Sequence, residues 1–286
     1  ADINPASLTS DVIILDDDQP QFSVQQGVSF PETDANTNRE IDVTLNIIPT
    51  TLATVRYRII PHLGTAGSAA TPSVDFTPVA SGSLSFAPGV TSQKLMFTTL
   101  GDTVDELDEL FDIVLFDPSA GTVLSLDSNA TITIIDDDTA KFSAYGTSVT
   151  ESDGVATVTG SLVGVSDRDI FVAYSIVPVT AHVGEDFIPV TGNYTWTAGT
   201  SGNFTFDIVI VGDVINELTE TFSVVFTSFT GSPQVISSTA TVTITDDDPI
   251  SFSVSSANTT EDAGSAPIIF VSLSSTADRP VNVEYI

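Results

Sequence analysis

Cysteine is absent from the 286-residue sequence. This excludes disulfides, thiol nucleophiles and cysteine-ligated zinc or iron–sulfur sites. The sequence also lacks a run of about 18 consecutive apolar residues, the length that a membrane helix needs. Its N-terminus shows no basic-then-apolar pattern of the kind that marks a signal peptide. We therefore expect no direct membrane insertion in this segment.

Basic residues are scarce. Lys and Arg number 7 against 38 Asp and Glu, which gives a formal net charge of -31. Such a surface repels phosphate backbones and anionic lipid headgroups, so nucleic acid is excluded as a partner. Because 41% of the residues are hydrophobic, the chain can still form packed cores. The acids are therefore expected to lie on a folded body.

Residues for enzyme chemistry are few. The chain has two histidines, His62 and His182, and no Gly-x-Ser-x-Gly elbow, P-loop or dinucleotide fingerprint. Carboxylates dense enough to bind calcium stay ionised and make poor general acids. We expect no enzymatic activity and interpret both histidines as solvated loop residues. Trp196 and Met96 are interpreted as core or sheet-surface positions on strands.

An internal repeat organises the sequence. Asp triplets begin at Asp16, Asp136 and Asp246, so successive triplets are 120 and 110 residues apart, the length of one β-sandwich domain. The pattern restarts after each triplet with a Phe and, nine or ten residues later, a Glu. The matching positions are Phe22 with Glu32, Phe142 with Glu151 and Phe252 with Glu261, then Val-x-Tyr at 55–57, 172–174 and 283–285, Asp-Phe at 75–76 and 186–187, and Gly-Asp loops at 101–111 and 212–222.

Hydrophobic residues alternate with a period of two, which indicates β-strands with one buried face. Thr, Val, Ile and Phe dominate these segments, and no helical spacing persists for ten residues. We predict an all-β fold of tandem immunoglobulin-like antiparallel β-sandwiches, about seven strands each, arranged end to end. The clearest alternations are Phe111, Ile113 and Leu115; Phe222, Val224 and Phe226; and Val242 with Ile244.

The two ends of the chain fall inside repeats. The predicted divisions are 1–18, the C-terminal strand of a preceding repeat; 19–138 and 139–248, two full repeats; and 249–286, the N-terminal part of a truncated further repeat. We therefore expect a segment of a longer protein whose neighbouring repeats are its partners. Three residues separate each triplet from the next Phe, too few for a flexible tether, which predicts ions close to the junctions.

The Asp triplets need a counter-charge, because ionised carboxylates at short range repel one another. No basic residue lies within a triplet or within the two Gly-Asp loops, so we expect few salt bridges there. A divalent cation is the alternative. Calcium takes six to eight oxygen ligands and tolerates irregular loops, whereas magnesium prefers to keep its water.

The order of these motifs resembles the Calx-beta domain, a family found in sodium/calcium exchanger regulatory regions, integrin β4, giant adhesion receptors, matrix proteins and microbial surface proteins. The resemblance covers both full repeats and the partial repeats beside them. It implies Ca²⁺ as the bound ion, held where acids converge at one end of the sandwich. The implied ligands are Glu32, Asp75, Asp102, Glu106, Glu109, Asp136, Asp137 and Asp138 in the first repeat, and Glu151, Asp186, Asp213, Glu217, Glu220, Asp246, Asp247 and Asp248 in the second.

The two ligand sets differ. Asn216 and Thr219 stand where the first repeat has Asp105 and Asp108, which predicts fewer or weaker ions in the second repeat. The competing interpretation is that all these acids are solvated loop residues that maintain solubility. Their recurrence at matching positions favours metal binding.

Two non-enzymatic functions follow. One is a calcium-binding structural segment of a stalk or filament in a cell-surface, extracellular-matrix or adhesion protein, with lateral or end-to-end self-association left open. The alternative is a calcium-sensing regulatory tandem attached to a membrane transporter or receptor. An extracellular location is the expectation for the first. Four Asn-x-Thr sequons are then glycosylation candidates, at Asn129, Asn193, Asn203 and Asn258.

Overall fold

The computed structural model describes residues 18–64, 67–262 and 264–284. The strand predicted within residues 1–18, with Asp16 and Asp17, therefore lies outside the described residues. The chain divides into two compact units: the first comprises 1–102 and 107–137, and the second 103–106 and 138–286. The described residues form strands and one short 3₁₀ turn, Glu151–Asp153, but no α-helix. The described residues thus contain no helix that is long and apolar enough to cross a membrane.

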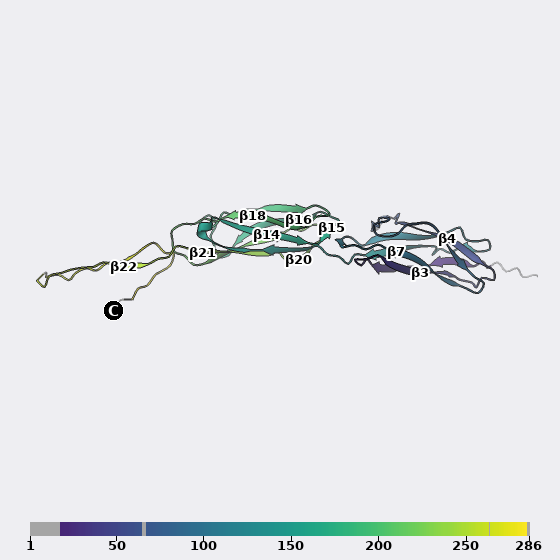
Figure 1. The fold of residues 1–286 in the computed structure, drawn as a ribbon, viewed down its shortest axis with the longest axis horizontal. Coiled ribbons are helices and arrows are strands. Elements are labelled where there is room, and N and C mark those ends of the chain that lie inside the picture. Colours follow the sequence, from purple (N-terminus) through teal and green to yellow (C-terminus); the bar gives the residue numbers. More distant parts are fainter. Residues whose placement is uncertain (1–17, 65–66, 263, 285–286) are drawn as a thin grey trace, which may run out of the picture. The chain divides into compact units, whose positions relative to one another are not determined.

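The first unit is a sandwich of two sheets (Figure 1). One sheet has the order β10-β1-β3-β7, and the other has β2-β11-β9-β4-β6 with β5 added beside β9. The strands are β1 (Gln21–Val24), β2 (Val28–Pro31), β3 (Thr37–Leu45), β4 (Ala53–Pro61), β5 (Ser68–Ala69), β6 (Val79–Phe86), β7 (Ser92–Thr99), β9 (Glu109–Phe116), β10 (Val123–Leu124) and β11 (Asn129–Ile135).

The second unit repeats this plan, with sheets β18-β14-β12-β20 and β13-β21-β19-β16-β17. Residues beyond 248 add the hairpin β22–β23, and β8 pairs in parallel with β15. The strands are β8 (Val104–Asp105), β12 (Lys141–Tyr145), β13 (Thr147–Thr150), β14 (Val155–Val163), β15 (Val165–Ser166), β16 (Ile170–Pro178), β17 (Gly192–Trp196), β18 (Gly202–Val209), β19 (Glu220–Thr227), β20 (Gln234–Ser237), β21 (Thr239–Thr245), β22 (Phe252–Val254) and β23 (Val271–Leu273).

The first strand of each sandwich is split between its two sheets. In the second unit β12 lies in one sheet and β13, directly after it, in the other. The crossing occurs at Gly146, where a Cβ would lie 1.8 Å from the carbonyl oxygen of Thr241. β13 pairs in parallel with the last strand, β21, as β2 does with β11 in the first unit. The predicted antiparallel sandwiches are confirmed, with parallel pairs added: this one, β1–β10 and β5–β9 in the first unit, and β12–β20 in the second.

The buried residues are those that the period of two predicts. Phe111 and Ile113 in β9, and Phe222 and Val224 in β19, are fully buried. Phe22 and Phe142, at the matching start of each repeat, are also fully buried, and each anchors its own core cluster. Burial of such side chains is the main stabilising term for a sandwich without disulfides.

Trp196 and Met96, interpreted from the sequence as core or sheet-surface residues, differ in burial. Trp196 is 3% exposed in β17, and its indole Nε1 donates a 3.0 Å hydrogen bond to the carbonyl of Gly202. Met96 is 54% exposed on β7. Trp196 is thus a core residue of the second unit.

The interpretation of His62 as a solvated loop residue is wrong. His62 follows β4 directly, and β4 pairs with β9 so that Ile60 faces Asp112. The imidazole Nδ1 of His62 consequently lies 2.9 Å from Oδ1 of Asp112, and the side chain is largely buried. His182, in contrast, has a side chain that is 71% exposed.

Candidate metal site

Strand register brings the acids of the second repeat together. The parallel pair β13–β21 places Thr150 beside Thr245. Glu151 and Asp246, the next residue in each segment, therefore emerge at the same edge. One carboxylate oxygen each from Glu151, Asp246 and Asp248 lies within 4.8 Å of the others.

A second group forms beside the start of β19. Glu220 opens this strand and lies opposite Ile244 of β21. The turn 183–187 carries Asp186, which is 8% exposed. Donor atoms of His182, Asp186 and Glu220 lie within 4.8 Å of one another. Glu217 lies between the two groups, since it interacts with both Glu151 and Asp186.

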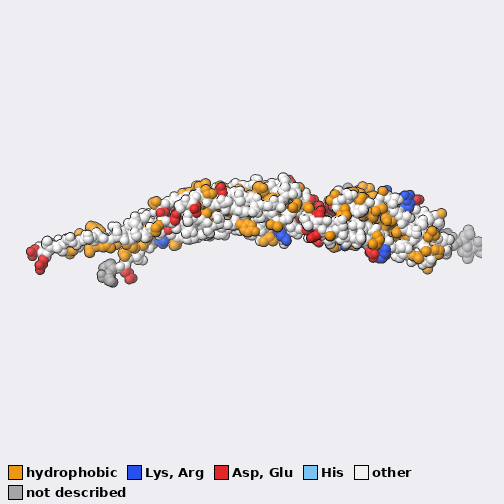
Figure 2. All heavy atoms as spheres, in the orientation of Figure 1, with side chains coloured by type: hydrophobic (Ala, Val, Ile, Leu, Met, Phe, Trp, Pro, Cys, Tyr) orange, Lys and Arg blue, Asp and Glu red, His pale blue; other side chains and the backbone are white. Residues whose placement is uncertain are grey.

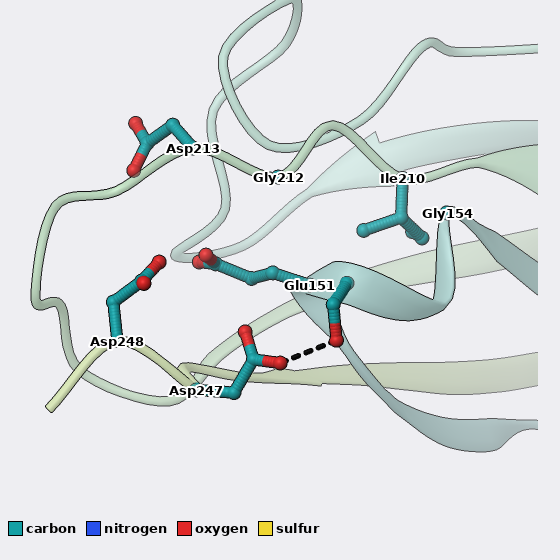
Figure 3. Close-up of a pocket in the computed structure, with 8 residues that line it drawn as sticks. Glu151, Gly154, Ile210, Gly212, Asp213, Asp247 and Asp248 are labelled. Carbon is teal, nitrogen blue, oxygen red and sulfur yellow. Dashed lines mark hydrogen bonds between the residues drawn. The ribbon is translucent and has the colours of Figure 1, made fainter.

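A pocket of about 410 Å³ is lined by four acids of the second repeat, Glu151, Asp213, Asp247 and Asp248. Figure 3 shows the carboxylates of Glu151 and Asp248 facing the same space, with Asp213 turned outward. Asp213 is exposed, and its Oδ1 accepts a 2.6 Å hydrogen bond from the backbone N–H of Ile215. Asp247, also exposed, accepts a hydrogen bond from the Ser152 hydroxyl (Figure 3). Asp213 and Asp247 are thus peripheral, with local partners of their own.

Burial and mutual repulsion change the protonation of the inner acids. Glu151 is 6% exposed, and burial, followed by the neighbouring Glu217, raises its pKa to about 7. Burial and then Asp186 raise the pKa of Glu220 to about 8. The pKa of Glu217 is also raised, chiefly by burial and then by Asp186. At neutral pH Glu151 and Glu220 are therefore partly protonated, and a bound cation would favour their ionised forms.

The donor set fits a hard divalent cation. Oε2 of Glu151 is buried without a hydrogen-bond partner, and an unpaired buried carboxylate oxygen is costly unless a cation or donor meets it. The Glu151–Asp246–Asp248 group offers oxygen donors alone, as calcium prefers. Glu151, Asp246 and Asp248 are thus the residues best placed to hold Ca²⁺ in the second repeat.

The first unit places its predicted ligands on the corresponding elements. Glu32 follows β2 as Glu151 follows β13, and it is 4% exposed. Asp75 is 5% exposed, with a carboxylate oxygen within 4.8 Å of one of Glu109. A carboxylate oxygen of Asp137 also lies within 4.8 Å of one of Asp34, an acid absent from the predicted set.

The remaining predicted residues of the first repeat are placed as follows. Asp102 and Asp136 are partly exposed, and the backbone N–H of Asp136 donates a 3.2 Å hydrogen bond to Asp108. Glu106 and Asp138, both partly exposed, belong to the second unit.

Basic residues from elsewhere in the chain reach both Gly-Asp loops, although the loops contain none themselves. Nη2 of Arg168 lies 2.8 Å from Oδ1 of Asp105 within the second unit, and Nη2 of Arg279 lies 2.8 Å from Oδ1 of Asn216. Each arginine is 63 residues further along the chain, so the loop sequences gave no indication of it. The equal spacing, with an acid or amide of the loop paired to an arginine in each case, is the pattern that could have revealed both contacts.

Cationic side chains elsewhere are dispersed. On the face seen in Figure 2 they form isolated spots without a continuous basic patch.

All four sequon asparagines are exposed. Asn129 begins β11, Asn193 lies in β17 and Asn203 in β18, and Asn258 lies between β22 and β23. Strands β17 and β18 are the outer strands of their sheets. Glycosylation at these positions stays a prediction.

Comparison with known proteins agrees with the motif pattern. Residues 16–138 and 139–248 each match the Calx-beta domain. A 70-residue segment, 24% of this chain, is 46% identical to the sodium/calcium exchanger Calx of Drosophila melanogaster and spans 7% of that protein's length.

Solved structures of similar domains include CBD12 from CALX1.2, at 24% identity, covering 78% of this chain and 99% of that one with a TM-score of 0.38. The apo-form Calx CBD1 domain is 32% identical, over 42% of this chain and 100% of that one, with a TM-score of 0.37. Because the two Calx-beta matches together cover residues 16–248, the chain belongs to the Calx-beta family.

Proposed function

We propose that this chain is a non-enzymatic calcium-binding tandem in which the loop carboxylates of each sandwich bind Ca²⁺, which in the second repeat replaces protons on Glu151 and Glu220. The buried carboxylate of Glu151 carries the proposal. Its Oε2 has no hydrogen-bond partner, and Asp246 and Asp248 bring further oxygens within 4.8 Å. Without a cation this arrangement is destabilising, because like charges are held together away from water.

Calcium binding would then stabilise the folded domains by linkage. Extracellular modules bind calcium with Kd of ~10⁻⁴ to 10⁻³ M, so each site adds roughly 0.4 to 1.4 kcal/mol at millimolar calcium. Several sites together amount to a large share of the marginal stability of a domain.

The biological role that we propose is a structural segment of a stalk or filament in an extracellular or cell-surface protein. The three-residue spacing between each triplet and the next repeat supports it, because ions bound there would restrict bending of the chain. Its partners would be neighbouring repeats and further copies of the chain. In that compartment the exposed Asn193 and Asn203 could carry glycans that cover two outer strands.

A calcium-sensing role is the second candidate. The 46% identity over 70 residues to a sodium/calcium exchanger favours it. Affinity separates the two roles, since a sensor responds near micromolar calcium whereas a structural segment can be saturated at millimolar calcium.

The decisive experiment is a calcium titration of the chelator-treated chain by calorimetry, repeated with Glu151→Gln. We expect calcium binding that raises the melting temperature, and weaker binding with a smaller rise in the variant. Glu185→Gln, at an exposed glutamate outside the predicted ligands, is the control. A chain whose melting and scattering curves are the same in calcium and in chelator would refute the proposal.

A further inference from the structure

A histidine joins the acidic cluster of the second repeat. Nδ1 of His182 lies 3.6 Å from Oδ2 of Asp186, and one donor atom each of His182, Asp186 and Glu220 lies within 4.8 Å of the others. Among the described residues this is the one possible metal-binding group that contains a nitrogen donor. The other histidine, His62, is paired with Asp112 and belongs to no such group.

Hydrogen bonds fix the backbone of the His182 loop and the carboxylate of Asp186. The N–H of His182 donates to the Asp186 carboxylate, and the N–H of Asp186 donates to the carbonyl of His182 at 3.0 Å. The preceding residue, Ala181, donates to the carbonyl of Thr221 at 3.0 Å, which fixes the loop beside Glu220. The fold thus places the backbone of His182 and the carboxylate of Asp186 beside Glu220 without a bound ion.

The donor chemistry differs from that of a calcium site. Imidazole nitrogen suits zinc and other first-row transition ions, whereas calcium and magnesium take oxygen ligands. Two ligands of a tetrahedral zinc ion lie about 3.4 Å apart, since each is about 2.0 to 2.1 Å from the metal. The 3.6 Å between His182 and Asp186 is close to this separation. Three protein ligands leave a fourth position for water.

We propose that His182, Asp186 and Glu220 form a site for Zn²⁺ or a similar transition-metal ion in the second repeat. The site shares Asp186 and Glu220 with the predicted calcium ligands, but zinc binding there does not require that the chain also bind calcium. The two ions would compete for these carboxylates, and His182 would bias that competition toward zinc.

The first repeat provides a natural control, because Thr71 stands where the second repeat has His182. The surrounding backbone is the same: the N–H of Thr71 donates to the Asp75 carboxylate, and the N–H of Asp75 donates to the carbonyl of Thr71 at 3.0 Å. Asp75 and Glu109 correspond to Asp186 and Glu220. The first repeat thus offers oxygen donors alone, and we expect it to bind zinc weakly.

The test is calorimetric titration of the full metal-free chain with ZnCl₂ and, separately, with CaCl₂. His182→Thr, which restores the residue of the first repeat, should weaken zinc binding at least about tenfold and leave calcium affinity within about twofold. Thr71→His should add a second zinc site. In NMR spectra zinc should shift the imidazole signals of His182 and not those of His62, which serves as the internal control.

Each outcome decides the question. Zinc binding of equal strength in the wild type and in His182→Thr would overturn the inference, because carboxylates alone would then explain it. Calcium binding without zinc binding would overturn it and leave the proposed function intact. Zinc binding that depends on His182, in a chain that does not bind calcium, would support it and refute the proposed function.

Discussion

Nδ2 of Asn216 donates a 2.8 Å hydrogen bond to Oδ2 of Asp246 and a 2.9 Å hydrogen bond to the carbonyl of Asp248. The amide thus supplies two donors to a loop crowded with negative charge. Asn216→Asp would remove both donors and add a carboxylate beside Asp246. We expect the metal-free variant to lose about 1 to 3 kcal/mol of unfolding free energy. Calcium should narrow the difference, as denaturant melts with and without chelator would measure.

Asn203→Asp is the matched control, since Asn203 is exposed in β18 and the substitution adds the same charge away from the site. A metal-free Asn216→Asp protein as stable as this control would contradict the role given to the amide.

Neutralising Glu151 should separate stability from ion binding. In Glu151→Gln the buried carboxyl no longer has to ionise, so the metal-free protein should be more stable near pH 8 than the wild type. The stabilisation that calcium brings should shrink, because one oxygen ligand has lost its charge. Thermal melts in chelator and in millimolar calcium measure both effects. A variant with less stability in chelator and an unchanged gain from calcium would contradict this prediction.

The metal-free chain should become less stable as the pH rises, whereas a salt-bridged acid makes a protein more stable as the pH rises. The pKa of Glu151 is raised from 4.5 to about 7 and that of Glu220 from 4.5 to about 8. Between about pH 5 and 8 the folded state therefore binds more protons than the unfolded state, so the free energy of unfolding falls as the pH rises. Calcium should reduce this slope, and its binding near pH 7 should release protons.

Melting temperatures across this pH range, in chelator and in calcium, measure the slope. Proton release follows from calorimetry in two buffers of different ionisation enthalpy. A melting temperature that rises from pH 5 to 8 in chelator would show that these two carboxyls do not dominate the pH dependence.

Tryptophan fluorescence should report the second unit alone, because Trp196 is the one tryptophan of the sequence and lies in that unit's core. The Phe142 ring lies 6.0 Å from the Trp196 ring and 5.2 Å from that of Phe226. Phe142→Ala should lower the stability of this unit by about 3 to 5 kcal/mol. The fluorescence midpoint in urea measures the loss.

Phe22→Ala, at the equivalent buried position of the first unit, is the control. It should lower the urea midpoint at which the first unit unfolds, as followed by circular dichroism, and leave the fluorescence midpoint almost unchanged. Equal shifts of the fluorescence midpoint in both variants would indicate that the two units unfold as one.

Most of the fold could be predicted from the sequence, because the same pattern of alternating hydrophobic residues occurs in both full repeats. Period-two alternation identified Phe111, Phe222 and their neighbours as core residues, and the fully buried Phe22 and Phe142 follow from their matched positions. The split of the first strand was not predictable from alternation. It depends on how closely Gly146 approaches Thr241, at the opposite end of the same repeat.

The candidate site was predictable in outline and not in its pairings. The recurring Glu and Asp-Phe motifs pointed to Glu151 and Asp186, both buried as a converging site requires. The contact of Arg168 with Asp105 is indicated only when the two repeats are compared, and no spacing shows that His182 lies beside Glu220. These contacts form when strand pairing brings distant segments of the chain together, and the sequence around each residue does not indicate which distant segment it will contact.

The parallel pairing of first and last strands has a mechanical consequence. In the second unit the residues of β13, from Thr147 to Thr150, lie in register with those of β21 from Val242 to Thr245. Tension applied at the two ends of this sandwich would slide β13 and β21 past each other along their length. The hydrogen bonds between them would share that load together, where a hairpin pulled open would break its bonds one after another. Such a shear clamp resists extension until the whole ladder yields.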